Sequence, residues 1–217
     1  MIGAQMKKET GAGTPVSENS TVITLVGDDT ERGENSVFAI RAQRLALQNE
    51  LLKWALAYAD RGIPVFPCRG NKKPLVKWSK GVDQHPDLTK RRATSDSVTV
   101  RAWWKRWPLA MIGVPTGSTS GFCVVDVDCK NGVDGFASLQ AIGGLPADAV
   151  GVRAPSGGAH FWFRLPAGQV IKNSASKIGP GIDIRGEGGF AIVPPSRPRP
   201  DGDDYCYMSP REMGSLA

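Results

Sequence analysis

Apolar positions at helical spacing predict a first helix over about residues 37–60. The apolar side of this helix is expected to consist of Leu45, Leu52, Ala55 and Ala59. Gly62 is well placed to end it, because glycine readily adopts the left-handed conformation that follows many helices. The preceding residues 1–35 are rich in Gly, Ser, Thr, Asn and acidic residues, and we expect a poorly ordered tail ahead of a single folded domain over residues 36–217.

A second apolar stripe predicts a helix that ends at about Trp107, just before Pro108. Either Ser95 or Asp96 can cap its start. The stripe occupies positions i, i+3, i+4 and i+7, and its members are Val100, Trp103, Trp104 and Trp107. Tryptophans can stack nucleobases, but this spacing is typical of a helix face buried in a core, and we interpret it so. The other faces of this helix carry Arg101, Lys105 and Arg106.

The rest of the chain alternates short apolar runs with turn residues, which predicts strands joined by tight loops. Strands are expected at residues 63–68, 122–130, 150–154, 160–165, 181–185 and 190–195, with a short helix at 136–142. Residues 78–94 are polar, basic and without a clear period, and the polar stretch before residue 181 is likewise interpreted as a loop.

Two carboxylates interrupt the most apolar of these runs, FCVVDVDCK. Successive strand side chains point to opposite faces, so Asp126 and Asp128 are expected on one face, about 7 Å apart. Two neighbouring anions repel each other unless a cation lies between them, and a hard divalent metal with oxygen ligands is the usual cation. The alternative is a strand end at which both carboxylates are simply solvated.

Length and composition place this sequence among soluble globular proteins. Its 217 residues are 41% hydrophobic and 22% charged, enough for one domain with a proper core. No apolar run approaches the roughly 20 residues of a membrane span, and the N-terminus lacks the apolar core of a signal peptide. The four cysteines are scattered, which argues against a disulfide framework or a zinc site and favours a reducing cytoplasm.

Positive charge is concentrated in one segment of the chain. Residues 61–110 contain 12 Lys plus Arg against 3 Asp plus Glu, whereas the remainder contains 15 against 18. Segregated positive charge suits a polyanionic partner such as nucleic acid or a triphosphate. Considered alone, the segment is more typical of a solvated basic face.

Two further segments carry candidate chemistry. Ser156, Gly157 and Gly158 form a predicted turn whose N–H groups can converge on an anion, and His160 follows it on a strand. In GIDIRGEGG, Asp183 and Arg185 share a strand face, which offers a third carboxylate and a cation; a plain surface ion pair is the alternative. The sequence has no GxxxxGK[ST] loop, no GxGxxG spacing and no Ser-His-Asp or Cys-His set.

The order VVDVD, PSGGAHFWF, GIDIRGEGGFAIVPPS resembles the primase–polymerase (prim-pol) domain of the archaeo-eukaryotic primase superfamily, found in plasmids, phages and prophages. The flanking pieces GIPVFPCRGNKKPLVKW and VPTGSTSGF fit as well, so the resemblance covers residues 51–207. It implies an α+β fold of two lobes, an N-terminal αβ unit and a C-terminal RRM-like unit, with the active cleft between them.

The resemblance also implies an activity and a set of site residues. The activity is template-dependent nucleotidyl transfer that makes and extends primers on single-stranded DNA from (deoxy)nucleoside triphosphates, with two Mg²⁺ or Mn²⁺ ions. Catalytic roles are implied for Asp126, Asp128 and Asp183 as metal ligands and for His160 beside them. The implied nucleotide-binding residues are Ser156, Gly157, Gly158 and His160, with Lys72, Lys73 and Arg185 placed near the triphosphate or template.

Many relatives continue into a helicase, so a separate or fused replicative helicase is a further expected partner, and no membrane is expected. This sequence stops soon after Tyr207, as a stand-alone protein or a truncated one would. Two other functions use similar features. One is a metal-dependent nuclease or phosphodiesterase, and the other is a non-catalytic nucleic-acid-binding replication module.

Overall fold

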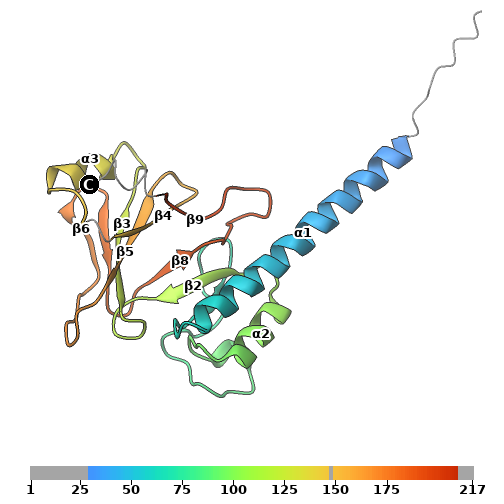
Figure 1. Cartoon of the computed structure of the whole chain (residues 1–217), viewed down its shortest axis with the longest axis horizontal. Helices are drawn as coiled ribbons and strands as arrows, with labels where there is room; N and C mark the ends of the chain where they lie inside the picture. The colour runs from blue at the N-terminus through green and yellow to red at the C-terminus, as the bar shows by residue number, and fades with distance from the viewer. Residues whose placement is uncertain (1–28, 147–148, 210–217) are drawn as a thin grey trace, which may run out of the picture. The chain divides into compact units, whose positions relative to one another are not determined.

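The computed structural model of the chain describes residues 29–146 and 149–209, and over these residues the fold is mixed α/β. It contains three α-helices, α1 (Asp29–Ala59), α2 (Ser97–Arg106) and α3 (Gly135–Ala141), and a 3₁₀ turn, η1 (Leu88–Lys90). The strands, most of them labelled in Figure 1, are β1 (Phe66–Cys68), β2 (Met111–Pro115), β3 (Phe122–Val127), β4 (Val150–Arg153), β5 (Ala159–Arg164), β6 (Ser174–Gly179), β7 (Ile182–Arg185), β8 (Phe190–Val193) and β9 (Cys206–Tyr207).

The strands form two antiparallel sheets. The smaller sheet has the order β1-β2-β8, and the larger has the order β6-β7-β3-β5-β4-β9. Strand β3, which carries Asp126, therefore lies inside the larger sheet with β5 on one side and β7 on the other. Central strands are fixed by ladders on both edges, so the side chains of β3 are held in a defined register.

Two hydrophobic clusters cover opposite faces of the larger sheet. One packs α1, α2 and the smaller sheet together with Val152 and Tyr205, and the partly buried Trp162 lies against it. The other consists of Val127, Leu139, Ala159, Phe161 and Ile182, and it includes α3. Alternation along β5 therefore separates Phe161 from the face that His160 and Trp162 share, as the sequence predicts.

The core interpretation of the second helix is confirmed. Asp96 caps α2 by accepting hydrogen bonds from the backbone N–H groups of Val98 and Thr99, and Val100, Trp103 and Trp104 are buried. The Nε1 atom of Trp104 donates to the carbonyl of Ala110 at 3.1 Å, and that of Trp103 donates to Leu88 at 3.1 Å. These rings are used inside the fold and are not free to stack on bases.

The first helix differs from its prediction in its start and in its buried face. Helix α1 begins at Asp29, earlier than expected, and the predicted tail lies otherwise outside the described residues. Leu45 is 57% exposed, whereas the buried face consists of Leu47, Leu51, Ala55, Tyr58 and Ala59. Leucines at several neighbouring positions fit two helical faces, and only packing against the rest of the fold decides between them.

Three differences concern the strands. Residues 174–179 form β6, where a loop was expected. The sequence did not indicate this strand because it is a largely exposed edge strand without an apolar alternation. The two-residue β9 was also not predicted. Strand β3 ends at Val127, so Asp128 lies just beyond it, where its N–H donates to the carbonyl of Gly181 at 2.8 Å. No helix in the described ranges is long and apolar enough to cross a membrane.

Candidate active site

Three polar residues form a row across the centre of the larger sheet. Asp126 on β3 is directly opposite His160 on β5 and directly opposite Asp183 on β7. Residues paired in this way across antiparallel strands have Cβ atoms about 5 Å apart. The register of the sheet therefore brings these three predicted residues together.

Arg185 holds the two aspartates of this row together. Its Nη2 donates to Oδ2 of Asp126 at 2.8 Å and to Oδ2 of Asp183 at 3.1 Å, and its Nε also donates to Asp126 at 3.1 Å. The side chains of Asp126 and Asp183 are only 15% and 21% exposed. Two such carboxylates need a partner cation, and in this structure the guanidinium supplies it.

Asp128 joins the same electrostatic group through Lys130, a residue that the sequence analysis did not select. The Nζ atom of Lys130 donates to Oδ2 of Asp128 at 2.7 Å. Asp128 is the main cause of a raised pKa at Lys130, and Asp126 and Asp183 add to it. The ammonium group of Lys130 thus interacts electrostatically with all three carboxylates. The sequence feature that could have identified Lys130 is its position two residues after Asp128.

His160 is buried beside Asp126, with Nε2 3.5 Å from Oδ1. Burial lowers the pKa of His160 below its ordinary value of 6.5, and the charge of Asp126 opposes this only in part. The imidazole is therefore neutral at neutral pH. The ring of Tyr205 covers it, with the ring centroids 5.5 Å apart.

Two members of this row, Asp126 and His160, line a cavity of about 420 Å³ that combines charged and aromatic walls, whereas Asp183 and the nearby Asp128 are not part of its lining. Its lining consists of Asp126, His160, Arg185, Lys72, Asn173, Trp78, Phe190, Tyr205, Gly188, Gly189, Ala191 and Ile192. Lys72 has its Nζ 5.8 Å from the centre of the Tyr205 ring. A ligand with an anionic end and a planar end matches these walls. The positive charges of Arg185 and Lys72 suit phosphates, and the aromatic rings suit a base.

The remaining predicted residues lie outside this lining. Lys73 is exposed, and its backbone N–H donates to Asn71. Ser156 and Gly157 are exposed in the turn before β5, and the Gly157 N–H donates to the carbonyl of Ala154 within that turn. That N–H group is therefore occupied, which leaves fewer donors for an anion than the sequence suggested.

Gly158 has a structural reason to be glycine. It is buried against the end of β3, where an added Cβ would overlap the carbonyl oxygen of Val127 and lie 3.4 Å from Cα of Asp128. The turn thus packs against the segment that carries Asp128, although it does not line the cavity.

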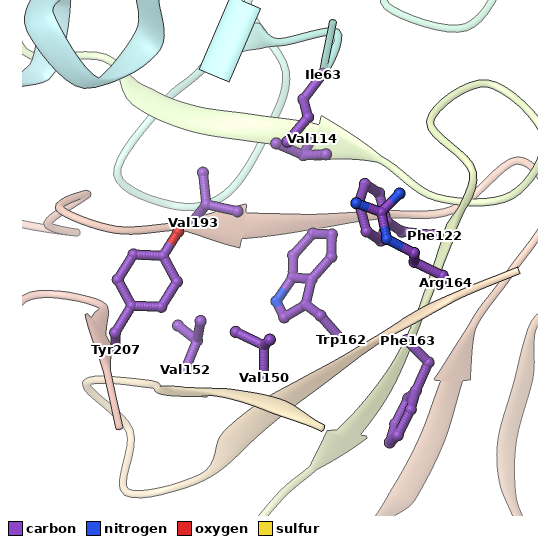
Figure 2. A pocket seen from close by; sticks show the side chains of 10 residues that line it. All are labelled: Ile63, Val114, Phe122, Val150, Val152, Trp162, Phe163, Arg164, Val193 and Tyr207. Carbon is purple, nitrogen blue, oxygen red and sulfur yellow. The ribbon is translucent and has the colours of Figure 1, made fainter. Parts of the chain in front are cut away.

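A second cavity, of about 450 Å³, lies on the same side of the larger sheet and is mainly apolar (Figure 2). Its lining consists of Ile63, Val114, Phe122, Val150, Val152, Trp162, Phe163, Arg164, Val193 and Tyr207. No carboxylate lines it, and its one charged group, Arg164, lies 5.3 Å above the ring of Phe122. Of these two cavities, the one lined by Asp126 therefore offers the carboxylate that a divalent ion would require.

The carboxylates in and beside the first cavity have the donor chemistry of a hard divalent cation site, although Asp126 alone of the three lines the cavity. Asp126, Asp128 and Asp183 offer carboxylate oxygens, the ligands that Mg²⁺ and Mn²⁺ prefer. Among the described residues, however, no three His, Cys, Asp or Glu side chains converge as a ready-made metal site. The carboxylates are balanced by Arg185 and Lys130, so an arriving ion would compete with these two groups.

Comparison with known protein families gives one match. The family model described as bifunctional DNA primase/polymerase, N-terminal (Prim-Pol), matches residues 55–216. No curated protein gives a significant match.

Proposed function

Because the chain belongs to the family of bifunctional DNA primase/polymerase N-terminal domains, we propose that it makes primers and extends them on single-stranded DNA. The observation that carries this proposal is the row Asp183–Asp126–His160, of which Asp126 and His160 line a cavity with both cationic and aromatic walls. The residue match begins at residue 55 and includes every member of this row.

The reaction is the attack of a 3′-hydroxyl oxygen on the α-phosphorus of a bound nucleoside triphosphate. The new phosphodiester bond forms as the α–β bond breaks, pyrophosphate leaves, and the hydroxyl proton is lost. Asp126, Asp128 and Asp183 would hold Mg²⁺ or Mn²⁺. Two such ions, when bound, supply positive charge that acidifies the hydroxyl and stabilises the transferring phosphoryl group.

The chain's own side chains supply the rest of the site. Arg185 keeps Asp126 and Asp183 together and lies where it can turn toward the triphosphate. Neutral His160 is suited to donate a hydrogen bond to a phosphate oxygen, and Lys72 adds positive charge across the cavity. Trp78 and Phe190 provide aromatic surface for the base.

The same proposal covers the finer organisation of the fold. We interpret the smaller sheet with α2 as the αβ unit of the family and the larger sheet with α3 as its RRM-like unit. The cavity draws Asp126, His160 and Arg185 from the larger sheet and Phe190 and Ile192 from the smaller, as an active cleft between two such units would. A replicative helicase as partner and a cytoplasmic location remain predictions.

The test is synthesis on single-stranded DNA with labelled nucleotides and Mg²⁺ or Mn²⁺, with and without an annealed primer. Products without a primer establish a primase. Extension of a primer alone establishes a polymerase that needs a further domain or partner to start. The absence of any product, both with and without a primer, would contradict the proposal.

One observation favours the non-catalytic alternative, a nucleic-acid-binding replication module. The three carboxylates already have protein cations as partners, so the site is electrically balanced without a metal. Titration with Mn²⁺ separates the two functions, because a binding module has no need to bind the ion. Degradation of labelled DNA without added nucleotides would instead identify a nuclease.

A further inference from the structure

A basic cavity outside the candidate active site has no role in the chemistry described above. We infer that this cavity, lined by Arg44, Arg69 and Arg106, binds the sugar-phosphate backbone of single-stranded DNA and leads the strand toward the nucleotide cavity. The inference of DNA binding stands on the cavity itself, whereas its use in guiding a template rests on the proposed function.

The cavity has a volume of about 380 Å³ and gathers arginines from three distant segments. Arg44 comes from α1, Arg69 from the loop after β1, and Arg106 from the last turn of α2. The other lining residues are Gln48, Cys68, Leu75, Trp107, Pro108, Leu109 and Ala110. No acidic residue belongs to this lining.

These arginines lack the partners that would make them structural. Among the described residues, no carboxylate forms an ion pair with Arg44, Arg69 or Arg106, although Asp83, Asp126, Asp128, Asp183 and Asp204 all pair with cations. Three like charges around one concavity repel each other and raise the local positive potential. An anion bound there relieves this repulsion.

The surrounding structure fixes the backbone position of each arginine. Arg106 lies over the ring of Trp107, 4.9 Å from its centre. Arg44 precedes the buried Leu47 and Leu51 by three and seven residues, so core contacts set the side of α1 on which it lies.

Arg69 is held by a tight turn. The N–H of Arg69 donates to the carbonyl of Lys73, and the N–H of Lys72 donates to the carbonyl of Arg69, both at 2.8 Å. Gly70, inside this turn, lies so close to the carbonyl of Pro198 that a Cβ there would overlap it.

The same turn connects the two cavities. Arg69 lines the basic cavity, while Lys72, three residues later, lines the cavity that contains Asp126 and His160. A nucleic-acid strand that contacts Arg69 therefore lies beside a turn whose Lys72 lines the candidate active site.

The arrangement favours a nucleic-acid strand over a free triphosphate. A triphosphate presents its charges within one compact group, which the walls around Lys72 already suit. Guanidiniums from three separate elements match the successive phosphates of a backbone, and each can bind a phosphate in a bidentate manner.

The experiment measures fluorescence anisotropy of a labelled oligothymidine against salt, without nucleotide or divalent metal. The test variant is Arg44→Gln/Arg69→Gln/Arg106→Gln. The matched control, Lys53→Gln/Arg101→Gln/Lys177→Gln, removes the same charge from exposed positions that line neither the basic cavity nor the nucleotide cavity. Circular dichroism and thermal melting verify that both variants fold. If the triple variant does not fold, the single variant Arg44→Gln replaces it as the test protein.

Each phosphate contact contributes about 0.7 to the slope of log K against log salt for single strands, so three contacts contribute about 2. The test variant is expected to lose about this much slope and at least about tenfold in affinity, and Arg44→Gln alone about 0.7 of slope. The control is expected to stay within about twofold of the parent. Equal losses in test and control variants, or no loss in either, would overturn the inference.

A second arm uses a labelled deoxynucleoside triphosphate with the same proteins. Retained nucleotide binding with weakened DNA binding supports a backbone site, whereas the reverse result makes the cavity a triphosphate site and overturns the inference. Because neither arm requires synthesis, a protein that binds DNA through these arginines yet makes no product would refute the proposed function and leave this inference standing.

Discussion

The guanidinium of Arg185 lies between Asp126 and Asp183, 2.8 Å from Oδ2 of the first and 3.1 Å from Oδ2 of the second. The three residues come from two adjacent strands, and Asp126 and Asp183 are paired in register. This cation balances charge that would otherwise destabilise the centre of the sheet.

Replacing Arg185 tests this balance. Arg185→Met leaves two largely buried carboxylates without a partner, and because the arginine is itself 39% exposed we expect a cost of about 1–3 kcal/mol. For a chain of this size this corresponds to a fall in Tm of about 5 °C in EDTA. Added Mn²⁺ should restore part of the loss, since it supplies the missing charge. A Tm that is unchanged in EDTA would contradict the role assigned to this ion pair.

Lys130 is predicted to compete with divalent ions. Its exposed ammonium pairs with Asp128, so Lys130→Met should free that carboxylate and tighten Mn²⁺ binding by up to about fivefold. Isothermal titration of the protein alone measures this effect. Lys177→Met, a lysine of β6 that lines neither the nucleotide cavity nor the basic cavity, is the control. Weaker binding in Lys130→Met would mean that the lysine supports the metal site.

The depressed pKa of His160 predicts a pH dependence of stability. The unfolded state takes up a proton near pH 6.5, whereas the buried, neutral imidazole of the folded state does so only at lower pH. The unfolded state therefore binds more protons as the pH falls below about 6.5, and folding is destabilised there. His160→Gln should lose less Tm between pH 7.5 and pH 5.5 than the parent does. An equal loss in both proteins would argue that His160 is not the group responsible.

Two substitutions in one turn separate packing from ligand binding. Gly158→Ala places a Cβ against the carbonyl of Val127 and should cost about 1–3 kcal/mol of stability. Ser156→Ala, at an exposed position, should leave Tm unchanged, and any effect should appear in the KM for nucleotide. Thermal melting and steady-state kinetics on both variants test this. A stable Gly158→Ala protein would show that the turn has room to shift.

Local patterns predicted the parts of the fold that short-range spacing determines. The stripe that contains Trp103 and Trp104 and the alternation around Asp126 and His160 were confirmed, because helix and strand periods decide which side chains share a face. Strand β6 and the exposure of Leu45 were not predicted, since both depend on which surface the rest of the chain covers.

The ion pairs of the candidate site could also not be predicted from short-range sequence patterns. The contact of Arg185 with Asp126 depends on the pairing of β3 with β7, which are separated by more than fifty residues. The turn that brings Arg69 and Lys72 to two different cavities likewise emerges only once β1 is placed beside β2. Register between distant strands is a property of the whole sheet.

The central claim is that Asp126 is at the centre of a nucleotidyl-transfer site, and one comparison tests it most directly. The rate of labelled nucleotide incorporation on single-stranded DNA is measured for the parent and for Asp126→Asn, which retains the shape of the side chain and removes its charge. With equal Tm values for the two proteins, we expect the variant to lose at least about a hundredfold in rate. A folded Asp126→Asn protein that incorporates nucleotides at the parental rate would contradict the claim.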